Sequence, residues 1–145
     1  MSELSVLSVA KCEELLGAAI VGRVAFTTDE GPQIVPVNYT TVDAAIVFRT
    51  EPGTQLGRHA VGNRLAFEID EVDYADHKGW SVVAVGTGEL VEDTATLEDA
   101  TPFWNPKPWV DGDRVLYVRL PWTRLTGRRI GAGWTRDNEL PVRRR

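Results

Sequence analysis

The residues best suited to chemistry lie at the end of a short β-rich run about one third of the way along the chain, and just after it. Arg49 and Thr50 end that run, and Thr54 and Gln55 follow after a Pro52-Gly53 turn. A guanidinium, two hydroxyl groups and the free amides at the start of a helix are groups that bind a phosphate monoester. The same pattern also fits a strand that ends in an exposed arginine, followed by a threonine that caps the next helix. Both interpretations stay open at this point.

A second candidate segment precedes the first and contains a proline inside a β-rich run. Proline has no N–H to donate to a strand ladder, so an edge, a bulge or a ligand is expected beside Pro36. Unpaired backbone groups along such an edge can pair with a planar heterocycle that alternates donors and acceptors. A plain surface strand is the alternative. The residues concerned are Val35, Pro36, Val37 and Asn38.

A third candidate opens a long β-rich run in the middle of the chain. Trp80 offers a flat stacking surface, and Ser81 adds a hydrogen-bond donor and acceptor next to it. A tryptophan buried in the core is the alternative interpretation.

The elements that would position these residues are mostly strands. Ser8 is a suitable N-cap for a short helix with an apolar stripe that includes Cys12. Cys12 is expected to pack in the core, because no basic neighbour lowers its thiol pKa. Turn residues then separate β-rich runs over 23–28, 33–40, 44–50, 64–71, 80–91, 114–120 and 125–130, with short helices expected from Thr54 and over 95–100.

This order predicts a mainly β fold with a short N-terminal helix and one or two further short helices. Short antiparallel strands favour a closed or partly closed barrel, because closure removes exposed strand edges. Gly86 and Gly88 interrupt the run from Trp80, where a barrel strand can bend. The length of 145 residues suits a single domain over 1–145, with flexible tails over 1–7 and 132–145.

Composition narrows the functional classes. One cysteine and two histidines argue against an internal disulfide and a metal site. No apolar run approaches the roughly 20 residues that span a bilayer, and no secretory signal pattern opens the chain, so we expect a cytoplasmic protein without membrane contact. An acidic body argues against nucleic acid as a partner, although residues 123–145 carry seven arginines against two acids.

Taken together, the motifs are similar to those of a known family. In chain order they are Val21-Gly22-Arg23-Val24-Ala25-Phe26, Ile34-Val35-Pro36-Val37-Asn38-Tyr39, Val47-Phe48-Arg49-Thr50, Gly53-Thr54, Ala66-Phe67-Glu68-Ile69-Asp70, Gly79-Trp80-Ser81-Val82 and Gly86. Their order and spacing over residues 8–130 resemble the pyridoxamine 5′-phosphate oxidase-like flavoproteins. The small actinobacterial-type members are the most similar.

The resemblance implies a split β-barrel, six-stranded, antiparallel and of Greek-key type, that forms a homodimer with one FMN in each of two interface clefts. By position, Val35, Pro36, Val37 and Asn38 match the strand along the flavin ring and its ribityl chain. Arg49 and Thr50 match the start of the phosphate site, and Thr54 and Gln55 match the positions that complete it. Ser81, with Trp80 before it, matches a polar position that reaches the flavin from the other subunit.

The chain departs from the family pattern at several positions. Gln55 stands where relatives usually carry lysine, which removes one positive charge from the phosphate site. Gln33 and Asn38 stand where the true oxidases carry arginine and lysine. These differences favour a substrate other than vitamin B6.

The resemblance therefore implies an FMN-dependent oxidoreductase that acts on a small organic substrate or electron donor. Two alternatives stay open: a flavin carrier or sensor without turnover, and a related split barrel that binds deazaflavin F420 or haem.

Overall fold

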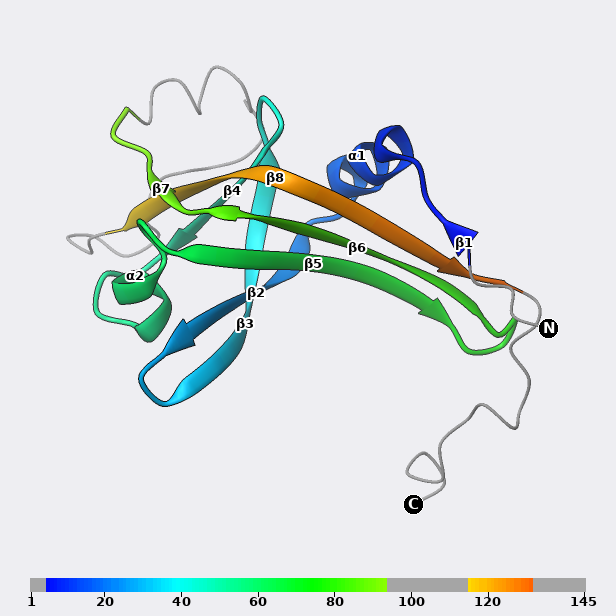
Figure 1. Ribbon diagram of the computed structural model, residues 1–145, viewed down its shortest axis with the longest axis horizontal. Coiled ribbons are helices and arrows are strands. Elements are labelled where there is room, and N and C mark those ends of the chain that lie inside the picture. The colour runs from blue at the N-terminus through cyan, green and yellow to red at the C-terminus, as the bar shows by residue number, and fades with distance from the viewer. Residues whose placement is uncertain (1–4, 94–114, 132–145) are drawn as a thin grey trace.

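The computed structural model describes residues 5–93 and 115–131 (Figure 1). The sequence-predicted strands and the helix beginning near Thr54 are present, while the helix predicted over 95–100 lies outside the described residues. In chain order the elements are β1 (Ser5–Val6), α1 (Val9–Ala18), β2 (Val21–Thr28), β3 (Gly31–Thr41), β4 (Ala45–Thr50), α2 (Gln55–His59), β5 (Arg64–Asp73), β6 (Lys78–Thr87), β7 (Glu89–Leu90) and β8 (Leu116–Ile130).

Six of the strands in these ranges close into an antiparallel ring, in the order β2, β3, β4, β8, β6 and β5. The successive strands β2, β3 and β4 are neighbours, and β5 returns to lie beside β2. This return is the Greek-key arrangement. The predicted mainly β barrel is confirmed.

Strand β8 differs from the sequence prediction, which divided it into 114–120 and 125–130. It is one strand that pairs with β4 up to Pro121 and with β6 from Trp122 onward. Pro121, which has no N–H to donate to a ladder, lies where the strand changes partner. The predicted bend at Gly86 is present as a register shift between Val85 and Gly86.

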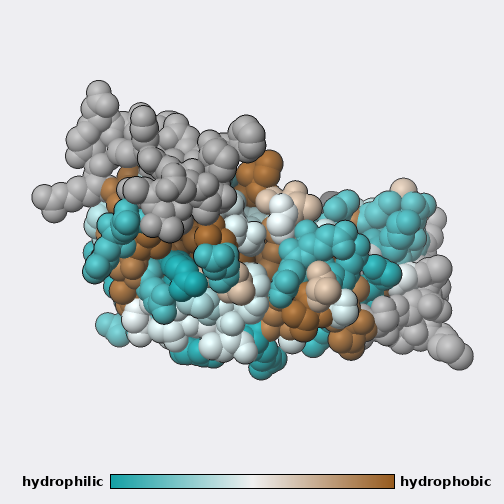
Figure 2. Space-filling model, turned by 90° about the horizontal axis from the view of Figure 1, so that it is seen from above, coloured by the Kyte–Doolittle hydropathy of each residue, from teal (hydrophilic) through white to brown (hydrophobic). Residues whose placement is uncertain are grey.

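The core fills the inside of the ring, and α1 packs against it. Large buried side chains come from facing strands: Ile46, Phe48, Phe67, Ile69, Val82 and Leu120. The Ser8 hydroxyl accepts a hydrogen bond from the Lys11 N–H, as expected of the N-cap. Cys12 is fully buried as predicted, and burial raises the pKa of its thiol. Seen from above, hydrophilic residues cover the region of α1 (Figure 2).

The N-terminal segment corrects one prediction. Residues 5–7 were expected in a flexible tail, but Ser5–Val6 pairs with β8 and the Leu7 N–H donates to the Gly127 carbonyl at 3.0 Å. The backbone of this segment is therefore part of the sheet. The other predicted tail, 132–145, lies outside the described residues.

The turn between β3 and β4 contains two non-glycine residues in the left-handed backbone conformation. Asp43 and Ala44 both have positive φ, at 49° and 58°. This left-handed conformation costs about 1–2 kcal/mol in a non-glycine residue, while glycine gives back about 0.5–1 kcal/mol through its freer unfolded state. We therefore expect Ala44→Gly to raise the free energy of unfolding by about 0.5–1 kcal/mol.

Urea denaturation measures this difference directly. The control is Ala45→Gly, since Ala45 is fully buried at the start of β4 and should lose stability on the same change. A decrease in stability for Ala44→Gly would show that the turn is not strained.

Candidate functional site

A cavity of about 580 Å³ lies between β3, the end of β4 and the start of α2. Among the residues that line it are Val35, Pro36, Val37, Asn38, Arg49, Thr50, Thr54 and Gln55. The structure therefore brings together both sequence-predicted segments, although they belong to different strands. The remaining two predicted residues, Trp80 and Ser81, do not line it.

The wall formed by β3 is an open strand edge. From Gly31 to Asn38 this strand pairs with β2, and it pairs with β4 only from Tyr39. The Tyr39 N–H donates to the Ile20 carbonyl at 3.0 Å, so the backbone groups of Tyr39 point toward β2. Backbone groups of successive residues in an antiparallel strand point alternately to its two sides, so those of Pro36, three residues earlier, point away from β2. The predicted edge at Pro36 is confirmed. The edge therefore has few donors, because neither Pro32 nor Pro36 has an N–H to offer, while the Ile34 N–H faces outward.

The second wall is the turn from β4 into α2, which Thr54 holds in place. The Thr54 hydroxyl donates to the Glu51 carbonyl at 2.7 Å and accepts the Gly57 N–H at 3.0 Å. It also lies 3.2 Å from the Thr50 hydroxyl. Because the proton of Thr54 is already donated, Thr50 is the donor of this pair, and its proton reaches a ligand only by turning away from Thr54. Thr54 therefore caps the helix and lines the cavity at the same time.

The charge lining the cavity is balanced. Arg49 contributes a positive charge and Glu51 a negative one, while Gln55 is neutral. Arg49 is half-buried at the end of β4, with Tyr117 of β8 as its cross-strand neighbour. An anionic group that enters here meets one guanidinium, one hydroxyl donor and the outward N–H of the strand edge.

Sequence reasoning missed several lining residues. Val21, Phe26, Glu51 and Leu56 also line the cavity, and Gln33 was noted only as a departure from the family pattern. Phe26 is directly opposite Gln33 in the pairing of β2 with β3, and Val21 is opposite Asn38. Only this register places β2 beside the site, and a single sequence does not show register.

Trp80 and Ser81 point to opposite faces of β6, as neighbours in a strand must. Trp80 packs against the core cluster, which matches the core interpretation of this tryptophan. Ser81 lies on the outer face, between Asp70 of β5 and Arg128 of β8. The two side chains therefore cannot act together on one ligand.

The acidic segment after Ile69 is not a site within the described residues. Asp70 pairs with Arg23, and the Asp73 carboxylate accepts the Ala75 and Asp76 N–H groups at 3.0 and 3.1 Å. The Asp76 backbone hydrogen bond lowers the pKa of Asp73. No group of three metal-ligating side chains occurs in the described ranges. None of the helices described there is long and apolar enough to cross a membrane.

Comparison with known proteins agrees with this geometry. The family model of pyridoxamine 5′-phosphate oxidase matches residues 8–129. The chain belongs to this family. An uncharacterized protein of Mycobacterium tuberculosis is 31% identical over 123 residues, which cover 81% of this chain and 80% of that protein.

Two solved structures of the family show the same fold. The FAD binding protein from Mycobacterium smegmatis has a TM-score of 0.72 and 32% identity, covering 87% of this chain and 98% of that one. The putative pyridoxamine 5′-phosphate oxidase from Corynebacterium glutamicum has a TM-score of 0.69 and 31% identity, covering 88% and 92%. The architecture of this chain is that of the family's split barrel.

The role of Thr54 in shaping the site can be tested through stability. Replacing an N-cap threonine with alanine removes the acceptor for an orphan N–H and typically costs about 1 kcal/mol. We expect Thr54→Ala to lower the free energy of unfolding by about this amount, measured by urea denaturation. Thr54→Ser keeps the hydroxyl and should retain most of the stability. Equal losses in both variants would contradict the capping role.

Proposed function

We propose that this chain binds a flavin, FMN, in the cavity beside β3 and uses it as an oxidoreductase. The observation that carries the proposal is that one cavity joins an open strand edge to the Arg49 and Thr50 side chains. An edge of this kind suits a flat heterocycle with several hydrogen-bonding groups, and the arginine suits its phosphate. The 32% identical neighbour is named an FAD binding protein, which supports a flavin.

The residues fit the parts of the proposed ligand. Arg49 and the Thr50 hydroxyl hold the phosphate, and Gln55 adds a neutral amide next to them. Val35 and Val37, half-buried on β3, provide an apolar surface for the ring. When bound, the flavin supplies the electron and hydride chemistry, while the protein orients the ring and excludes water from one side.

The substrate would be a small organic molecule or an electron donor that reaches the exposed side of the site. Arg49 and Glu51 are the charged side chains among the lining residues, so the cavity selects weakly for substrate charge. A flavin carrier or sensor would use the same binding residues. Reduction of the bound flavin by NADH or NADPH, followed by oxidation by a candidate acceptor, separates an enzyme from a carrier.

We further propose that the protein is a homodimer and that Ser81 completes the site of the other subunit. Ser81 lies on the same outer sheet face as Pro36 and Asn38, but on β6, with β2 and β5 between. That separation is too large for Ser81 to reach the cavity of its own chain. A second copy packed on this face brings its Ser81 to the open side of β3.

The identity of the ligand is tested on the purified full chain. Absorbance and the mass of the extracted chromophore identify it directly, and titration of the stripped protein with FMN and FAD compares the two flavins. We expect FMN to bind more tightly. Tighter binding of FAD would correct the ligand within the flavin class, and extraction of F420 or haem would overturn the proposal.

Arg49 should dominate the affinity for the phosphate. A hydrogen bond to a charged group is worth about 1.5–3 kcal/mol, and Gln55 provides no second cation. We expect Arg49→Ala to weaken FMN binding by about this amount in a fluorescence titration. Arg58→Ala is the matched control, since Arg58 is exposed on α2 outside the cavity lining, and Gln55→Lys should tighten binding. Unchanged affinity in Arg49→Ala would place the phosphate elsewhere.

The shared cleft is tested by mixing two damaged chains. We expect Arg49→Ala and Ser81→Phe homodimers each to bind flavin poorly, because every cleft then carries one defect. A heterodimer of the two has one cleft with both defects and one intact cleft. Purified heterodimers should therefore bind about half a flavin per chain. Binding no better than in the parents would show that Arg49 and Ser81 do not meet across subunits.

A further inference from the structure

The outer face of the sheet formed by β3, β2, β5, β6 and β8 carries an unusual charged cluster. The side chains that α1 and α2 bury belong to the core on the other face. On the outer face, one cross-strand row contains Pro36, Arg23, Glu68, Val83 and Thr126. Around this row the face is mixed: the apolar residues Val21, Ala25, Ile34, Ala66 and Val85 alternate with polar ones, including Asn38, Ser81, Arg124 and Arg128.

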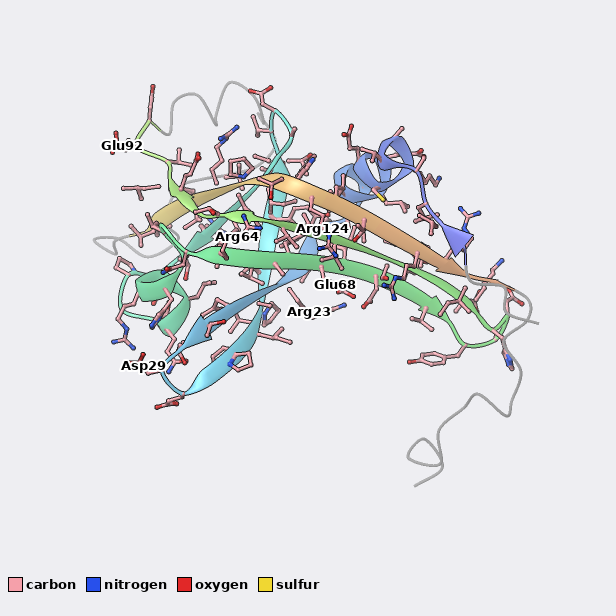
Figure 3. All side chains as sticks on the ribbon, in the orientation of Figure 1. Arg23, Asp29, Arg64, Glu68, Glu92 and Arg124 are labelled. Atoms are coloured by element: carbon pink, nitrogen blue, oxygen red, sulfur yellow. The ribbon has the colours of Figure 1, made fainter. Side chains whose placement is uncertain are left out.

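The cluster joins one arginine to two carboxylates. Arg23 Nη2 lies 2.8 Å from Glu68 Oε1 and 2.6 Å from Asp70 Oδ2. The three side chains are 44%, 31% and 37% exposed, so they are partly shielded by their neighbours. Arg23 and Glu68 lie side by side on β2 and β5 in Figure 3. With both acids ionised, the cluster has a net charge of −1.

The strand order places this cluster at a particular point of the proposed dimer. The shared cleft requires β3 of one copy to lie over β6 of the other. Because β2 and β5 are the two strands between β3 and β6, the same two-fold rotation exchanges β2 with β5. Arg23 and Glu68 share one row across these two central strands. In the dimer, Arg23 of one copy therefore faces Glu68 of the second copy, and Glu68 of the first copy faces Arg23 of the second.

We propose that the Arg23, Glu68 and Asp70 cluster lies at the two-fold axis of the homodimer, with Arg23 of each copy facing the carboxylates of the other, and that the surplus acid makes association take up protons. This inference rests on the shared cleft proposed above. Two arginines and four carboxylates meet at the axis, which leaves two negative charges among apolar side chains. A proton on a carboxyl removes one of them.

The other charged groups of this face do not supply the missing positive charge. Arg124 and Arg128 stand on β8, separated from β5 by β6, and Arg64 stands on β5 with Ala66 between it and Glu68 on the same face. In the proposed dimer, β8 of the second copy lies beyond β3 of the first copy, away from the two-fold axis. From β6, the residues nearest the cluster are Ser81 and Val83, which are uncharged. The carboxylates therefore depend on Arg23 and on protons for neutralisation.

The surroundings of Glu68 support this proton uptake. Burial, followed by the hydrogen bond and charge of Asp70, raises the pKa of Glu68 in the single chain, although Arg23 opposes the shift. Asp70 is the partner that stays ionised, because its hydrogen bond with Glu68 lowers its pKa. In the dimer, the facing Arg23 of the second copy favours ionisation of Glu68 and its two carboxylates oppose it, so the net charge of −1 on the facing cluster disfavours ionisation. Association should therefore strengthen as the pH falls toward the raised pKa of Glu68.

The location of the axis is tested by charge reversal, with sedimentation equilibrium as the readout. We expect Arg23→Glu, and separately the double variant Glu68→Arg with Asp70→Arg, to be monomeric, because each creates like charges across the axis. An equimolar mixture should form heterodimers, since one face is then acidic and the other basic. Lys11→Glu on α1 is the control and should dimerise like the wild type. Charge-reversed chains that remain homodimers would overturn the proposal, provided circular dichroism shows them folded.

The proton linkage is tested by measuring the dimer dissociation constant between about pH 8 and about pH 5. For each proton taken up on association, the dissociation constant falls by up to about tenfold for every unit by which the pH is lowered. The Glu68→Gln variant should associate more tightly than the wild type at the upper end of this pH range and should lose most of the pH dependence. The Glu71→Gln variant, changed on the same strand, should keep the pH dependence of the wild type. A constant that is independent of pH in the wild type would overturn the linkage.

These outcomes separate the two proposals. A wild-type protein that is monomeric throughout would remove the shared cleft and this inference together, while flavin titration still tests the cavity. A flavin-binding dimer that tolerates reversal of Arg23 would leave the proposed function intact and refute only the position of the axis.

Discussion

Closure of the six-stranded ring is the constraint on which the remaining features depend. Strand β8 closes it by pairing first with β4 and then with β6, and the change occurs where Gly86 passes Pro121. A Cβ atom built on Gly86 would lie 2.1 Å from the Pro121 carbonyl oxygen, well inside any possible contact. Glycine is therefore needed at this crossing. With the ring closed, the apolar faces of all six strands bury one continuous core.

The same closure creates the candidate site. Strand β3 pairs with β2 and then continues past it to pair with β4, so one edge of its first eight residues stays open. Pro36 fits this edge because its nitrogen needs no partner there. The end of β4 places Arg49 beside the open edge, and the turn that follows brings Thr54 back toward it and is held by the hydrogen bonds of Thr54. The cavity is thus a consequence of how the barrel closes.

The outer sheet face connects the cavity to the proposed second copy. Pro36 and Arg23 are cross-strand neighbours, so the cavity wall and the charged cluster belong to one surface. Exposed apolar residues such as Val21 and Ile34, 52% and 67% exposed, lie on this surface beside the ions. A mixed surface of this kind suits a partner that matches both its shape and its charge, and the proposed second copy would match the charge by placing Arg23 over Glu68.

Sequence alone determined the features that depend on nearby residues. The Ser8 cap, the buried stripe around Cys12, the Thr54 cap and the edge at Pro36 each follow from a few neighbouring residues, and the ordered motifs indicated the family and its barrel. These predictions succeeded because caps, helical periodicity and the missing proline N–H act over short distances.

Tertiary structure decided what depends on strand register. It joined two predicted strands into β8, placed Val21 and Phe26 at the cavity, turned Trp80 and not Ser81 toward the core, and brought Arg23 onto Glu68 and Asp70. The two partners of Arg23 lie 45 and 47 residues away in the chain. Such contacts form only when the closed ring sets which residues face one another, because a shift of one residue would turn every side chain of a strand to the opposite face.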